Sequence, residues 1–72
     1  GPVRTAIIGY GFAGKSFHAY LVGLASGLKL IGIASRDEET RKRIEREQSC
    51  RAYDSPEAAF ADPDVDLIIL AT

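Results

Sequence analysis

Three glycines near the start of the chain restrict what this sequence can fold into. Gly9, Gly11 and Gly14 follow the apolar run at residues 3–8 and form the pattern G-x-G-x-x-G. Glycine inside a helix or strand costs roughly 0.5–1 kcal/mol relative to alanine, so these three require a compensating use. In a dinucleotide-binding strand–turn–helix unit, the first glycine permits the tight turn and the second lets the pyrophosphate approach the backbone. The third lets the helix pack closely on the strand.

The apolar residues around this motif alternate between strand and helix patterns along the chain. Strands are predicted at residues 3–9, 28–35, 50–53 and 65–72, and helices at residues 12–26, 37–48 and 56–61. Asp37 and Ser55 are typical N-caps, and Pro56 stands where proline is favoured in a first helical turn. Strands that alternate with helices predict an α/β fold with a parallel sheet and right-handed crossovers.

Composition and charge exclude several classes of partner. Nine Lys and Arg residues against ten Asp and Glu give a net charge of −1, so no general attraction to nucleic acid or to an anionic membrane is expected. No apolar run approaches the ~20 residues that span a bilayer. The single cysteine, Cys50, cannot form an internal disulfide, which is typical of a reducing cytoplasm, and no metal-ligand spacing occurs. We therefore expect a cytoplasmic protein without a metal site.

The residues after the second predicted strand bear on which dinucleotide would bind. NAD-binding units carry an Asp or Glu about 20 residues after the glycines, where it binds the ribose 2′-hydroxyl. Ser35 and Arg36 stand there instead and suit a 2′-phosphate, because guanidinium binds phosphate through paired hydrogen bonds. This favours NADP as the cofactor. NAD is the alternative, since Asp37 could serve the ribose although it is also needed as an N-cap, and Arg36 could be only an exposed loop residue.

Three segments of the chain resemble a known family of oxidoreductases. They are "IIGYGFAGKSFHAYL", "GLKLIGIASRD" and "AYDSPEAAFADPDVDLIILAT", and together they resemble the Gfo/Idh/MocA oxidoreductases over residues 3 to 72. The resemblance implies an N-terminal Rossmann domain that, in the family, precedes a second domain for sugar-like substrates. It also implies hydride transfer between NAD(P) and a carbon that bears a hydroxyl group.

The resemblance transfers a binding role to some residues and a catalytic role to none. It implies that Gly9, Gly11, Gly14, Ser35 and Arg36 bind the cofactor. The family's catalytic lysine lies in an E-K-P motif, and its other acid–base residues lie in the second domain. Neither has a counterpart in this sequence, so this chain alone is not expected to be active, although its parent would be an NAD(P)-dependent oxidoreductase.

These observations lead us to expect a truncated Rossmann fold with four parallel strands in the order 3-2-1-4. We expect residues 1–2 to be the remnant of a cleaved tag and residues 3–72 to be the N-terminal part of a dinucleotide-binding domain, without its substrate domain. Cofactors bind outside the carboxyl ends of the strands at the point where the strand order reverses. The residues expected to complete this site are Phe12, Ala13, Ala71 and Thr72.

Two function hypotheses stay open. The first is a cofactor-binding piece of an NADP- or NAD-dependent oxidoreductase, and the second is a self-associating structural piece that binds no cofactor. A homo-oligomer is expected because residues 67–70 form an open apolar edge strand, and such edges pair with other chains. We also expect the sheet face that carries only the helix at 56–61 to expose alternate side chains from 6–8 and from 67–70.

Overall fold

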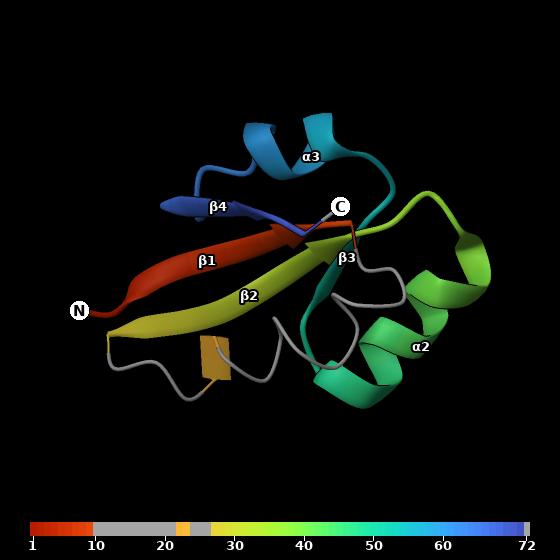
Figure 1. Ribbon diagram of the computed structural model, residues 1–72, viewed down its shortest axis with the longest axis horizontal. Helices are drawn as coiled ribbons and strands as arrows, with labels where there is room; N and C mark the ends of the chain where they lie inside the picture. The colour runs from red at the N-terminus through yellow and green to blue at the C-terminus, as the bar shows by residue number, and fades with distance from the viewer. Residues whose placement is uncertain (10–21, 24–26, 72) are drawn as a thin grey trace.

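The computed structural model describes residues 1–9, 22–23 and 27–71 of the chain. The elements are β1 (Val3–Ile8), β2 (Leu28–Ala34), α2 (Glu38–Gln48), β3 (Arg51–Tyr53), α3 (Pro56–Ala61) and β4 (Leu67–Leu70). All strand pairs are parallel and their order is β3-β2-β1-β4 (Figure 1), which confirms the predicted topology. The helix predicted at 12–26 lies outside the described residues except for Val22 and Gly23, which are helical.

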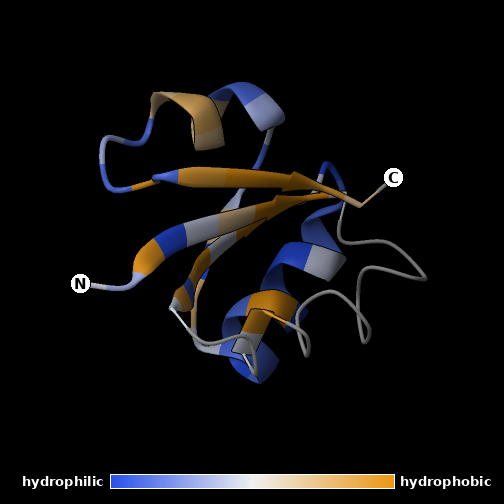
Figure 2. Cartoon of the chain, turned by 60° about the vertical axis from the view of Figure 1, so that its left-hand side comes forward, coloured by the Kyte–Doolittle hydropathy of each residue, from blue (hydrophilic) through white to orange (hydrophobic). Residues whose placement is uncertain are grey.

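The sheet separates two apolar clusters, and β1 contributes to both. Alternate side chains of a strand point to opposite faces, so Ile7 packs on one face while Ala6 and Ile8 pack on the other. Ile44 of α2 belongs to the first cluster and Ala59 of α3 to the second. The apolar strands therefore lie between the two helices, as Figure 2 shows. Burial on both faces is typical of parallel sheets and explains why residues 6–8 of β1 and 30–34 of β2 are apolar.

Helix α3 covers its face of the sheet more completely than the sequence predicted. Ala6 and Ile8 are 0% and 6% exposed, so the expectation that they would be exposed is wrong. The helix packs on the sheet through the small residue Ala59, which lets it approach closely. Exposed apolar surface remains farther out, where Leu70 of β4 is 69% exposed and Phe60 of α3 is 61% exposed.

Both described helices begin at the predicted N-caps. The Asp37 carboxylate accepts a hydrogen bond from the Thr40 backbone N–H at 2.9 Å, and the Ser55 hydroxyl accepts one from the Ala58 N–H at 3.1 Å. Each bond satisfies a backbone donor that the first turn of a helix leaves free. The last strand is shorter than predicted because the residues before Leu67 form a turn.

A bulge in β2 directly precedes Gly32, which faces Tyr53 of β3. Thr5 pairs with Leu30 but Ala6 pairs with Gly32, so Ile31 is an extra residue in β2. A Cβ atom at Gly32 would lie only 2.3 Å from the Tyr53 ring. Glycine is therefore required here, because the ring occupies the space that any side chain at this position would need.

Ion pairs join the amino ends of the strands to the turn before β4. The Arg51 guanidinium contacts Asp62 at 2.6 Å and Asp64 at 2.9 Å. Arg4 contacts Asp64 at 3.4 Å and Asp66 at 3.0 Å. These aspartates thus connect β1 and β3 to the α3–β4 turn, at the opposite end of the sheet from the glycine motif. None of the helices that the structure describes is both long and apolar enough to cross a membrane.

Candidate functional site

The carboxyl ends of β2, β1 and β4 lie side by side in the sheet (Figure 1), and Gly9 directly follows β1. The Gly9 N–H donates a hydrogen bond to the carbonyl of Ala34, the last residue of β2, at 3.2 Å. On the other side, the N–H of Ala71, just after β4, donates to the carbonyl of Ile8 at 2.9 Å. Because β2 and β4 lie on opposite sides of β1, Gly9 stands where the strand order reverses, the usual position of a ligand in an open α/β sheet.

The backbone of Gly9 has the left-handed conformation that a tight turn needs. Its φ is 91°, a value that side chains rarely tolerate and that glycine adopts without steric cost. This is the role that the motif assigns to its first glycine. Gly11, Phe12, Ala13, Gly14 and Thr72, the other predicted site residues of these two loops, lie outside the described residues.

The turn between β2 and α2 is held from several directions. The Ser35 N–H donates to the Tyr53 carbonyl at 2.9 Å, and the Ser35 carbonyl accepts from Nη1 of Arg41 at 2.9 Å. The Ser35 hydroxyl accepts from the Asp37 N–H at 3.3 Å. Arg36 is exposed and has no hydrogen bond or ion pair with any other described residue. Among the described residues, Arg36 is thus a cation without a partner, two positions after the carboxyl end of β2.

The carboxylate of Asp37 is already hydrogen-bonded within the chain. Its Oδ2 accepts hydrogen bonds from the Thr40 backbone N–H at 2.9 Å and from the Thr40 hydroxyl at 2.6 Å. These bonds hold the pKa of Asp37 below its ordinary value, because they favour the ionised form. Of the two roles that the sequence left open for Asp37, the structure shows the N-cap.

Sequence reasoning missed Thr40 and Arg41. Thr40 could have been found, because a polar side chain three residues after an N-cap is typical of reciprocal capping. Arg41 could not, since its bond to the Ser35 carbonyl depends on how α2 leaves the sheet and follows no sequence pattern.

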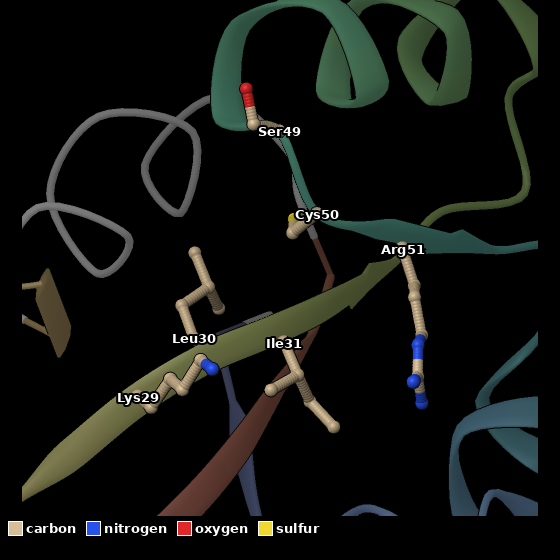
Figure 3. Close-up of a pocket in the computed structure, with 6 residues that line it drawn as sticks. All are labelled: Lys29, Leu30, Ile31, Ser49, Cys50 and Arg51. Carbon is tan, nitrogen blue, oxygen red and sulfur yellow. The ribbon is translucent and has the colours of Figure 1, made fainter.

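A separate pocket of about 380 Å³ lies at the amino ends of β2 and β3, away from Gly9 (Figure 3). It is lined by Lys29, Leu30, Ile31, Ser49, Cys50 and Arg51. Figure 3 shows that Leu30 points to one side of the strand, and Ile31 and Arg51 to the other. Burial raises the pKa of the Cys50 thiol to about 11, so the thiol stays protonated at neutral pH and is a poor nucleophile. Cys50 is therefore not an activated thiol in this pocket.

The sheet order and the turn at Gly9 define an NAD-binding Rossmann domain. Residues 3–72 match a family model described as an oxidoreductase family with an NAD-binding Rossmann fold. The chain belongs to this family, the Gfo/Idh/MocA oxidoreductases, as its sequence motifs indicated.

Two curated proteins and one solved structure illustrate the relationship. An uncharacterised oxidoreductase, YdgJ of Escherichia coli, is 37% identical over 97% of this chain and 20% of its own length. Inositol 2-dehydrogenase 2 of Mycolicibacterium vanbaalenii is 34% identical over 97% of this chain and 21% of its own length. GenD2 of gentamicin A biosynthesis, solved in complex with NAD, is 25% identical with a TM-score of 0.84, over 99% of this chain and 20% of its own. The chain thus spans about a fifth of the length of these relatives.

Proposed function

We propose that this chain binds the adenosine and pyrophosphate part of a nicotinamide dinucleotide at the carboxyl ends of β1, β2 and β4. The observation that carries the proposal is the left-handed turn at Gly9, placed between the ends of β2 and β4. Glycine at this position permits the tight turn, and the second glycine of the motif, Gly11, would let the pyrophosphate approach the backbone. Gly11, Phe12, Ala13 and Gly14 would continue the same cradle.

The remaining proposed contacts come from the neighbouring strand ends. Ser35 and Arg36 would meet the ribose of the adenosine, because they follow β2 directly. Ala71 and Thr72 would border the cofactor from the end of β4, where the Ala71 N–H is bonded to β1. When bound, the nicotinamide supplies hydride transfer. We assign no catalytic group to this chain, whose residues bind and orient the cofactor in a cytoplasmic oxidoreductase.

We infer that the preferred cofactor is NADP. Arg36 is the uncommitted charge in the β2–α2 turn, and guanidinium pairs with phosphate through two parallel hydrogen bonds. The carboxylate that could bind the ribose of NAD, that of Asp37, is engaged by Thr40. NAD is the second candidate, and the presence of NAD in the GenD2 complex supports it.

Calorimetric titration of the purified chain with NADP, NAD and ADP-ribose tests both parts of the proposal. A charge-assisted contact to the 2′-phosphate is worth about 1.5–3 kcal/mol, so NADP should bind roughly tenfold or more tightly than NAD. ADP-ribose should bind about as well as NAD if the chain recognises mainly the adenosine and pyrophosphate. Equal affinity for NADP and NAD would contradict the preference, and no binding of any of the three would contradict the site.

The alternative function is self-association without cofactor binding. The observation in its favour is the exposed apolar surface of Leu67, Leu70 and Phe60, which are 39%, 69% and 61% exposed. Since β4 is an edge strand, its free backbone groups and apolar side chains could pair with a second copy of the chain. Self-association combined with a failed titration would favour this alternative.

A further inference from the structure

The β2–α2 turn contains one carboxylate, and Thr40 holds it in place. Asp37 Oδ2 accepts both the backbone N–H and the hydroxyl of Thr40, the latter at 2.6 Å, a length typical of strong hydrogen bonds to an ionised acceptor. The start of α2 adds to this, because the positive end of a helix dipole favours an anion. The carboxylate is thereby held at the first turn of α2.

The backbone of the turn is fixed as well. The Ser35 peptide groups are bonded to the Tyr53 carbonyl through its N–H and to the Arg41 guanidinium through its carbonyl. The Asp37 N–H is bonded to the Ser35 hydroxyl. A movement of the turn backbone would have to break these bonds, and a rotation of the Asp37 side chain toward the cofactor ribose would have to break its two bonds to Thr40.

A carboxylate at this strand end decides between the two cofactors. It accepts hydrogen bonds from the 2′-hydroxyl of NAD, and it repels the 2′-phosphate of NADP. We propose that Thr40 is a specificity-determining positioning residue: by holding Asp37 as the N-cap of α2, it keeps this carboxylate off the ribose and leaves the position to Arg36. This inference rests on the proposed function, since it assumes a dinucleotide bound at Gly9.

The first test compares two substitutions of Thr40. Thr40→Val keeps the branched shape but removes the hydroxyl donor, whereas Thr40→Ser keeps the donor and serves as the control. In Thr40→Val, the ratio of NADP affinity to NAD affinity should fall by about fivefold, as expected when one of two bonds to the carboxylate is removed. In Thr40→Ser, the ratio should stay within about twofold of that of the unsubstituted chain. An unchanged ratio in Thr40→Val would overturn the inference.

The second test removes the charge of Asp37 and keeps the cap. Asparagine caps helices about as well as aspartate, so Asp37→Asn preserves the helix start. In the unsubstituted chain, this change should leave NAD affinity unaltered, because the carboxylate does not reach the ribose. Combined with Thr40→Val, Asp37→Asn should abolish the increase in NAD affinity that the freed carboxylate is expected to produce in Thr40→Val. A large loss of NAD affinity from Asp37→Asn alone would show that Asp37 already binds the ribose, and would overturn the inference.

A third measurement does not depend on the cofactor. NMR titration of the Asp37 carboxyl group should give a pKa below the ordinary value, and Thr40→Val should move this pKa back toward that value while Thr40→Ser should not. A pKa that Thr40→Val leaves unchanged would show that the hydroxyl does not hold the carboxylate.

The titrations also separate failure of the proposed function from failure of the inference. If the unsubstituted chain binds neither nucleotide, the proposed function fails and the inference with it. If it binds both and the ratio does not respond to Thr40→Val, the inference alone fails.

Discussion

Single residues in this protein decide local geometry where the backbone turns. Gly9 provides a left-handed turn at the end of β1, and Ser49 adopts the same region of backbone space, with a φ of 52°, after the last turn of α2. Arg36 differs from both, because its exposed side chain contributes to no described contact. Gly9 and Ser49 therefore influence the stability of the fold, whereas the side chain of Arg36 is available for binding.

Arg36→Ala should remove most of the preference for NADP and leave NAD binding little changed. The substitution deletes the charge-assisted hydrogen bonds to the 2′-phosphate, worth about 1.5–3 kcal/mol, and NAD lacks this phosphate. Because Arg36 is exposed, the midpoint of urea unfolding should not move. Titrations of the variant with both nucleotides check the prediction, and a retained preference would assign the phosphate to another residue.

Ser49→Gly should stabilise the fold. A side chain in the left-handed region costs about 1 kcal/mol, which glycine does not incur. The free energy of unfolding in urea should therefore rise by about 0.5–1 kcal/mol, less the extra entropy of glycine in the unfolded chain. Glu45→Gly, at an exposed position inside α2, is the matched control and should destabilise by about 1 kcal/mol. Equal effects of the two substitutions would contradict the prediction.

At the scale of elements, the turn before β4 is held to β1 and β3 by charge. Asp62 accepts hydrogen bonds from the Tyr53 hydroxyl and from Arg51, both at 2.6 Å, and Asp64 receives a second bond from Arg51. Arg4 of β1 binds Asp66 through its side chain and its backbone N–H. These contacts set where β4 begins, and so align β4 with β1.

This arrangement makes stability depend on pH. The Tyr53 hydroxyl, the Asp64 N–H and the Arg51 guanidinium lower the pKa of Asp62 to about 2. In the unfolded chain the pKa is near the ordinary value of about 3.9, so ionised Asp62 favours the folded state above roughly pH 4. This contribution should be lost as the pH falls toward 2.

Urea unfolding of the unsubstituted chain and of Asp62→Asn between pH 7 and pH 2 measures this dependence. The variant should be less stable at neutral pH, because an amide replaces the charge that faces Arg51. The difference between the two chains should shrink as the pH falls below about 4. A difference that stays constant down to pH 2 would show that Asp62 is not the group that titrates.

At the scale of the whole molecule, the sheet has an open edge at β4. Among the described residues, the largest fully buried side chains are Ile7, Ile33, Ile44 and Thr5. Small domains bury a low fraction of their surface and are marginally stable for this reason. The exposed side chains of Leu70 and Phe60 favour association, since contact between two copies of the chain would bury them.

The 72-residue chain should therefore self-associate at high micromolar concentration. Leu70→Lys should weaken the association without unfolding the chain, because Leu70 is already 69% exposed and a charge on an edge strand opposes pairing. Sedimentation equilibrium of both chains, with circular dichroism as a check on folding, measures the effect. A single folded species of 7.8 kDa for the unsubstituted chain would contradict the prediction.

The features that the sequence by itself determined are the local ones and the topology that follows from them. Apolar runs predicted the described strands, and the N-caps Asp37 and Ser55 marked where α2 and α3 begin, because a cap bonds to a residue only three positions away. The glycine motif placed a turn at Gly9, and the alternation of strands with helices led to a parallel sheet.

The tertiary structure alone decided the contacts between residues far apart in the chain. Arg4, for example, pairs with Asp66, 62 positions away. The burial of Ala6 and Ile8 was likewise mispredicted, because it depends on how closely α3 approaches the sheet. The physical reason is the same in each case: such distances are set by packing between elements, and neither a residue's type nor its local period specifies them.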